Sequence, residues 1–156
     1  EFVTKDNVHE ATNLEKIRSL MANAERLGEN EVVKRCKKRI FEIAGNEGET
    51  EIEIRLFQAL AAYEEILREK HNKAVRANYT KRKIKNKGVI QTLTDWALDK
   101  KVTPGFEALV SQGLEDFTGE KIVIDFAEEF PVEVVDSASI KLKGVLEEIE
   151  NEKLSD

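Results

Sequence analysis

Apolar residues recur at intervals of three and four positions through most of this chain, and this spacing is typical of one face of an α-helix. The first apolar stripe comprises Leu14, Ile17, Leu20, Met21, Ala24 and Leu27. Asn13 precedes it at the position of a helix N-cap, and Gly28 follows it where a left-handed residue commonly ends a helix. The pattern therefore predicts a first helix between Asn13 and Gly28.

Two further helices are predicted in the N-terminal half. The second runs from about Glu29 to Ala44, and the short break before it indicates an αα-hairpin. The third runs from about Glu51 to His71 and is the longest. Acidic residues gather in its first turn and basic residues at its end, an arrangement that the helix dipole favours at both ends.

The C-terminal half carries shorter apolar stripes. We expect four helices there: one after Gly88 that ends near Lys101, one from Pro104 to Gln112, one over residues 119–127 and a last one from Pro131. Residues 121–126 (KIVIDF) have the composition of a β-strand. We still interpret them as helical, because no partner strand is visible and a lone strand leaves its backbone groups unpaired.

These elements predict an all-α fold, a compact bundle of six or seven helices. The N-terminal αα-hairpin and the long third helix are expected to pack on a C-terminal helical half. With 156 residues the chain is long enough for one domain with a sizeable core. We expect a flexible lead-in at residues 1–12, a single helical domain at 13–150 with a sub-division near 72–80 as an alternative, and an acidic tail at 151–156.

The distribution of charge adds a feature that a plain helical bundle does not need. The chain has 25 basic and 31 acidic residues, for a net charge of −6. Nine Lys or Arg and a single acid, Glu69, lie between Arg68 and Lys87, so this segment carries +8 while 16 basic against 30 acidic residues leave −14 elsewhere. Residues 70–87 contain no acid at all.

A run of cations without intervening acids is typical of a surface that binds phosphate. We therefore predict that this segment binds the backbone of DNA or RNA, with low sequence specificity and a steep dependence on salt. The candidate residues are Lys73, Arg76, Asn78, Tyr79, Lys81, Arg82, Lys83, Lys85 and Lys87. A second basic patch, formed by Lys34, Arg35 and Lys38, either extends this surface or pairs with nearby glutamates.

Three other interpretations of the basic segment stay open. It can be a solvated helix face without a ligand, although such faces usually mix both signs at i, i+4 spacing. It can belong to a protein-interaction or oligomerisation module that docks an acidic partner or a second copy of the chain. The chain can also be a fragment or regulator of a nuclease. Asp99-Lys100-Lys101 matches the acid-x-Lys letters of a nuclease motif, and Asp116, Glu120 and Lys121 are suggestive by letter, but both lack the strands of that motif.

The sequence predicts no catalytic site, metal or cofactor. His9 and His71 lie far apart, and Cys36 has no Cys or His at ligand spacing. No glycine-rich phosphate-binding motif is present. Trp96 lies on an apolar helix face and is expected in the core.

The single cysteine and the lack of a signal peptide favour the cytoplasm. No apolar run approaches the roughly 18 residues of a membrane span, so no membrane partner is expected. The chain has no initiator Met, and Glu1-Phe2 is the dipeptide that an EcoRI cloning site encodes. We therefore expect a longer natural protein, in which a catalytic domain outside this chain stays an alternative.

Three stretches between Ala59 and Phe130 resemble small bacterial proteins of uncharacterised function that are associated with restriction and mobile-element neighbourhoods, sometimes with nuclease domains. These stretches are LAAYEEIL, RANYTKRKIKNKGVIQTL and PGFEALVSQGLEDFTGEKIV. The resemblance covers about half of the chain. It implies a bacterial protein that acts beside nucleic acid, and it implies neither an enzyme nor particular functional residues.

Overall fold

The computed structural model describes residues 2–72 and 77–155. Within these residues the predicted all-α fold is confirmed, with eight α-helices where six or seven were expected. The first half contains η1 (Val8–Glu10), α1 (Leu14–Leu27), α2 (Asn30–Ala44), η2 (Gly45–Glu47) and α3 (Glu51–His71). The second half contains α4 (Asn78–Lys87), α5 (Val89–Leu98), α6 (Pro104–Ser111), η3 (Glu115–Phe117), α7 (Gly119–Asp125), η4 (Ala127–Glu129) and α8 (Val132–Ser155).

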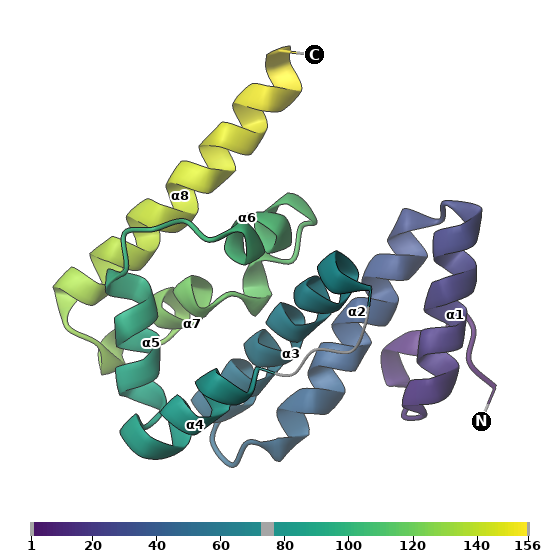
Figure 1. Cartoon of the computed structure of the whole chain (residues 1–156), viewed down its shortest axis with the longest axis horizontal. Helices are drawn as coiled ribbons and strands as arrows, with labels where there is room; N and C mark the ends of the chain where they lie inside the picture. The colour runs from purple at the N-terminus through teal and green to yellow at the C-terminus, as the bar shows by residue number, and fades with distance from the viewer. Residues whose placement is uncertain (1, 73–76, 156) are drawn as a thin grey trace.

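The helices form two groups that meet along α3. Helix α2 packs on α1 as the predicted αα-hairpin and on α3, and α3 in turn contacts α5, α6 and α7. Figure 1 shows α1–α3 on one side of the molecule and α5–α8 on the other, with α4 at the end opposite the C-terminus. Helix α8 packs on α5, α6 and α7, and its last turns project beyond the other helices (Figure 1).

Local capping sets several of these helix ends. The Asn13 Oδ1 accepts a hydrogen bond from Lys16 N at 3.1 Å, and Gly28 ends α1 with a φ of 72°, so both predicted caps of α1 are confirmed. The Thr118 Oγ1 likewise accepts from Lys121 N at 3.2 Å at the start of α7. The KIVIDF segment is therefore helical, as predicted, and it buries Ile122 and other apolar side chains.

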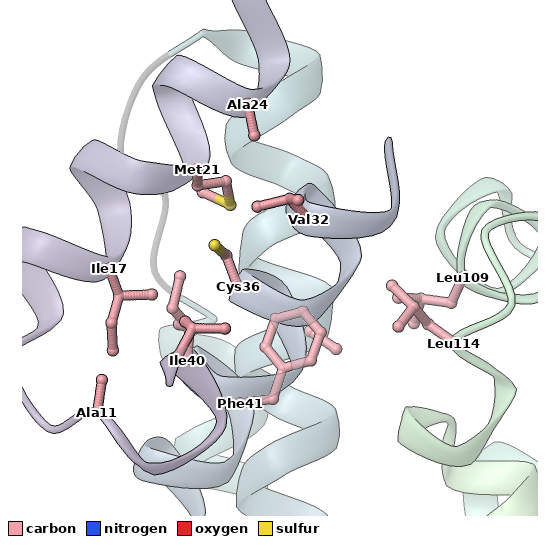
Figure 2. Packing of buried hydrophobic residues seen from close by; sticks show 12 residues of the cluster. Ala11, Ile17, Met21, Ala24, Val32, Cys36, Ile40, Phe41, Leu109 and Leu114 are labelled. Atoms are coloured by element: carbon pink, nitrogen blue, oxygen red, sulfur yellow. The ribbon is translucent and has the colours of Figure 1, made fainter. Parts of the chain in front are cut away.

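The first core lies within the α1–α2 hairpin and extends through Phe41 to Leu109 and Leu114 of the second group of helices (Figure 2). Its largest fully buried side chain is Phe41, whose ring meets Phe117 edge to face at a centroid distance of 5.1 Å. Residues 2–12, expected as a lead-in, place Val8 and Ala11 in this core. Burial, and to a lesser degree Glu25, raises the pKa of the central Cys36 to about 11, so the thiol stays protonated at neutral pH.

The second core joins α3 to α5, α7 and α8. It contains the buried side chains Leu56, Ala59, Leu93, Ala97, Ile122, Val123, Phe130, Val134 and Ala138. A small third cluster joins α6 to α8 through Phe106, Val110, Leu142 and Val145. These contacts bring the middle of α3, the end of α5 and the starts of α6 and α7 around one position that Thr80 of α4 also reaches.

Candidate nucleic-acid interface

Helix α4 carries the basic segment on the surface of the protein. It has ten residues, and none of them is buried. Its single apolar residue, Ile84, is half-buried against the second core. The backbone N–H of Gly88, which has a φ of 90°, closes the helix by donating to the Ile84 carbonyl. Because α4 contributes so little to the core, its sequence is free to present charge.

One face of α4 points to solvent. Asn78, Tyr79, Arg82, Lys85 and Asn86 are exposed and follow the i, i+4, i+7 spacing of one helical face, and Lys87 is exposed at its end. Tyr79 is 76% exposed, which is unusual for a large aromatic side chain. The structure thus brings most of the predicted contact residues together, whereas the predicted Lys73 and Arg76 lie outside the described residues.

The opposite face of α4 is neutralised by neighbouring helices. The Lys83 Nζ lies 2.9 Å from the Asp95 Oδ2 of α5, and the Lys81 Nζ lies 3.8 Å from the Glu64 Oε1 of α3. The lack of acidic residues at 70–87 therefore does not leave every cation of this segment without an ion-pair partner, because other helices supply the acids. Of the five bases in α4, Lys81 and Lys83 are ion-paired, and Arg82, Lys85 and Lys87 face outward.

The hydrogen bond from Lys83 is the main reason why the pKa of Asp95 is lowered. A second hydrogen bond, from the Gln91 Nε2 at 2.8 Å, acts in the same direction. Since a lowered pKa means that the folded state favours the ionised carboxylate, the pair stabilises the protein above the ordinary Asp pKa of 3.8. This contribution is lost as the pH falls through the lower folded-state value.

Asp95→Asn is accordingly expected to reduce the free energy of unfolding at neutral pH by up to about 1 kcal/mol, as for other partly exposed pairs. Its difference from the wild type should shrink once the pH falls below 3.8. Urea denaturation followed by circular dichroism between about pH 7 and pH 2 measures this difference. Asp136→Asn on α8 is the matched control, and a destabilisation by Asp95→Asn that grows in acid would contradict the assignment.

The side chains of the second basic patch contact different parts of the chain. The Lys34 side chain lies over Gly113, where an added Cβ would be 2.7 Å from the Lys34 Nζ. The Arg35 Nη1 donates to the Lys5 carbonyl at 3.4 Å, and Lys38 is exposed. Helix α2 packs mainly on α1 and α3, whereas α4 packs on α5, so the packing does not join this patch to α4.

Two other cations of α2 serve the fold instead of the surface. Lys37 is only 8% exposed, and its Nζ donates to the Gln112 Oε1 at 2.9 Å and pairs with Glu69. The Arg39 Nε donates to the Ala11 carbonyl at 2.7 Å. Not all of the positive charges that the sequence places on α2 are therefore accessible to a ligand.

A cavity that the sequence did not predict lies next to α4. Its volume is about 280 Å³, and Thr80 of α4 forms part of its lining. Aromatic side chains from three other helices, Tyr63, Trp96 and Phe106, supply much of its wall. Trp96 was expected in the core, and it does pack against the second core while also lining this cavity.

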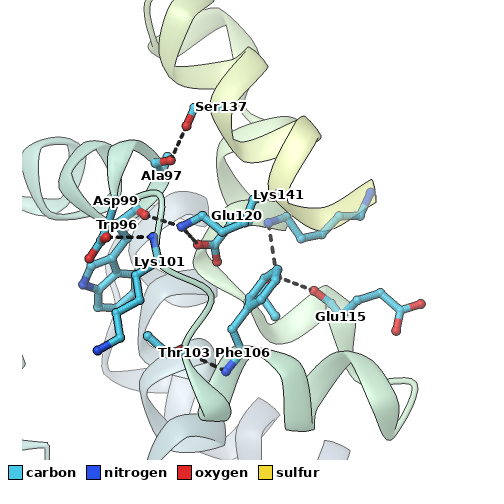
Figure 3. Close-up of polar contacts among 12 residues, drawn as sticks. Trp96, Ala97, Asp99, Lys101, Thr103, Phe106, Glu115, Glu120, Ser137 and Lys141 are labelled. Carbon is cyan, nitrogen blue, oxygen red and sulfur yellow. Dashed lines mark hydrogen bonds and ion pairs between the residues drawn. The ribbon is translucent and has the colours of Figure 1, made fainter. Parts of the chain in front are cut away.

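A buried ion pair forms the polar part of the cavity wall. The Lys141 Nζ lies 2.9 Å from the Glu120 Oε2, and both side chains are more than nine-tenths buried. The same Nζ donates to the Trp96 carbonyl at 2.8 Å and lies 6.0 Å from the centre of the Phe106 ring (Figure 3). No local sequence signal points to this pair, because only the packing of α7 on α8 brings the two residues together.

The acid-x-Lys letters do not form a common site in the structure. Glu120 pairs with Lys141, whereas Lys121 pairs with Asp125 at 2.9 Å. The Asp99 Oδ1 accepts from the Lys101 backbone N at 3.0 Å, so it caps a turn. Within residues 2–72 and 77–155, no group of three His, Cys, Asp or Glu could hold a metal ion, and no helix has the length and apolar character of a membrane span.

Comparison with known proteins adds no relative: no protein-family model, curated protein or solved structure matches this chain. The resemblance to restriction and mobile-element proteins therefore stays a prediction. The functional argument depends on the exposed face of α4 and the cavity beside it.

Proposed function

We propose that the protein is a non-catalytic nucleic-acid-binding accessory domain that holds DNA or RNA phosphates against the exposed face of α4. The observation that carries this proposal is the outward set of Arg82, Lys85 and Lys87 on a helix without buried residues. Among the described residues, none forms a salt bridge with these three side chains, although the charge of Lys87 also helps to lower the pKa of Asp95. Their positive charge is thus available to a polyanion in spite of the acidic body.

The chemistry of the same face suits a nucleic-acid backbone. Arg82 and Lys85 are three residues apart, which is about 4.5 Å along the helix axis. Long side chains of this kind reach neighbouring phosphates. Asn78 and Asn86 offer amide groups for sugar or phosphate oxygens. The exposed ring of Tyr79 can stack on an unpaired base, which is a sequence-tolerant contact. These groups favour binding with little base specificity.

The test compares two triple charge reversals of equal size. Arg82→Glu, Lys85→Glu and Lys87→Glu change the face of α4, and Lys34→Glu, Arg35→Glu and Lys38→Glu change the second patch by the same charge. Fluorescence polarisation with labelled single-stranded and duplex DNA measures affinity at 50 and 200 mM salt. Circular dichroism checks that both variants stay folded.

Three phosphate contacts predict that the wild type loses affinity for duplex about 40-fold between these salt concentrations, and for single strands about 20-fold. The α4 reversal should abolish this binding, whereas the control should change the affinity by less than about threefold. If both reversals weaken binding equally, net charge and not α4 governs it. If the wild type does not bind at low salt, the proposal is wrong and an acidic protein partner becomes the better explanation.

A further inference from the structure

We propose that the cavity beside α4 binds a single nucleobase, from a free nucleotide or from a strand that α4 holds. For a free nucleotide the inference does not depend on the proposed function. For a strand it rests on the proposed function, because the base in the cavity and the phosphates on α4 then belong to the same ligand. Three observations carry it: the size of the cavity, its aromatic wall and an available carboxylate oxygen.

The size and wall of the cavity suit one planar ring system. A volume of about 280 Å³ is just below the range of pockets that enclose drug-sized ligands, so it is large enough for one base. Tyr63, Trp96 and Phe106 line the cavity from three different helices. Stacking on aromatic rings is favourable for every base, because each base has a π-face.

Two glycines determine where the aromatic rings lie. A Cβ on Gly119 would be 2.5 Å from the Trp96 ring, and a Cβ on Gly105 would be 3.1 Å from the Tyr63 ring. Each ring is therefore seated directly on backbone, at a position that any other residue would disturb. The two glycines thus help to define the shape of the cavity.

The buried carboxylate supplies the polar contact that orients a base. Lys141 is the donor to the Glu120 Oε2, and no described residue donates to the Glu120 Oε1. A carboxylate oxygen accepts hydrogen bonds from the exocyclic amino groups of adenine, cytosine and guanine. Uracil and thymine have no exocyclic amino group, and they present a carbonyl oxygen, which a carboxylate repels, where cytosine has its amino group. The site should therefore prefer bases with an amino group.

The rim of the cavity connects this base site to α4. Thr80 belongs to α4 and lines the cavity, and the exposed Lys101 lines it from the α5–α6 connection. Tyr63 is 40% exposed, so the aromatic wall reaches the surface. A phosphate attached to a base in the cavity then lies near Lys101, and a strand that leaves the cavity past Thr80 has to pass around α4 to reach Arg82 and Lys85 on its outer face.

The chain has one tryptophan, Trp96, so its intrinsic fluorescence reports directly on the cavity. The experiment titrates the protein with AMP, GMP, CMP and UMP, and separately with oligo(dC) and oligo(dT), while following this emission. Nucleotides with an amino group should quench it and bind at least about fivefold more tightly than UMP, and oligo(dC) should do the same relative to oligo(dT).

Two variants separate stacking from recognition of the amino group. Ala59→Leu fills the cavity from α3 and should weaken quenching by about tenfold or more, whereas Ala22→Leu, on an exposed position of α1, should have no effect. The double variant Glu120→Met with Lys141→Met removes the carboxylate at similar volume. It should still quench but lose the preference of CMP over UMP, which keeps the test valid if Ala59→Leu does not fold.

The outcomes distinguish this inference from the proposed function. If DNA binds in a salt-dependent manner through α4 but neither nucleotides nor strands change Trp96 emission, the base site is wrong and the proposed function stands. If Ala59→Leu folds and leaves quenching unchanged, the base site is also wrong. If mononucleotides quench in the wild type but no polynucleotide binds, the cavity is confirmed as a nucleotide site and the proposed function of α4 fails.

Discussion

Lys141→Met is expected to lower the free energy of unfolding by about 3–5 kcal/mol, because it leaves the Glu120 carboxylate buried without its partner. Both side chains are more than nine-tenths buried, so solvent does little to compensate for the loss. The Trp96 carbonyl also loses the donor that lies 2.8 Å away. Urea denaturation followed by circular dichroism measures the change.

The double variant Glu120→Met with Lys141→Met separates charge pairing from packing. Replacement of a buried ion pair by apolar residues of similar volume is often neutral or stabilising, so we expect the double variant to be close to the wild type. A double-mutant cycle then gives a coupling free energy of at least about 3–5 kcal/mol in magnitude, because the double variant lacks the loss that Lys141→Met shows alone. A double variant as unstable as Lys141→Met alone would show that the Lys141 stem acts by packing.

Phe41→Ala is expected to cost about 3–5 kcal/mol, the second large effect. The Phe41 side chain is fully buried, and its edge-to-face contact with Phe117 joins α2 to η3 in the other group of helices. Its removal leaves a cavity where the two groups meet. Phe2→Ala is the matched control, since the Phe2 side chain is 83% exposed and should contribute little.

The same experiment tests whether the two groups of helices unfold together. Trp96 lies in the second group and reports on it by fluorescence, whereas circular dichroism reports on all helices. In a single cooperative domain both signals shift to the same lower urea concentration in Phe41→Ala. A variant in which circular dichroism shifts but Trp96 emission does not would show that the hairpin unfolds independently.

Local patterns along the chain were sufficient for most of the secondary structure. The apolar stripes and the caps at Asn13, Gly28 and Thr118 depend on residues within one or two turns of each other, so they can be read without a fold. The KIVIDF segment was correctly interpreted as helical because no partner strand was visible. The helix count was too low, because the basic run before Gly88 forms a helix of its own, α4, in addition to the helix predicted after Gly88.

The sequence by itself determined the all-α class, the hairpin and the placement of a basic segment at the end of a long helix. Only the tertiary structure decided which cations stay available, since Glu64 and Asp95 come from other helices to pair with Lys81 and Lys83. It also assembled the cavity and the Glu120–Lys141 pair from α3, α5, α6, α7 and α8. Charge pairing and cavity shape depend on distances through space between distant residues, which no periodicity along a single chain encodes.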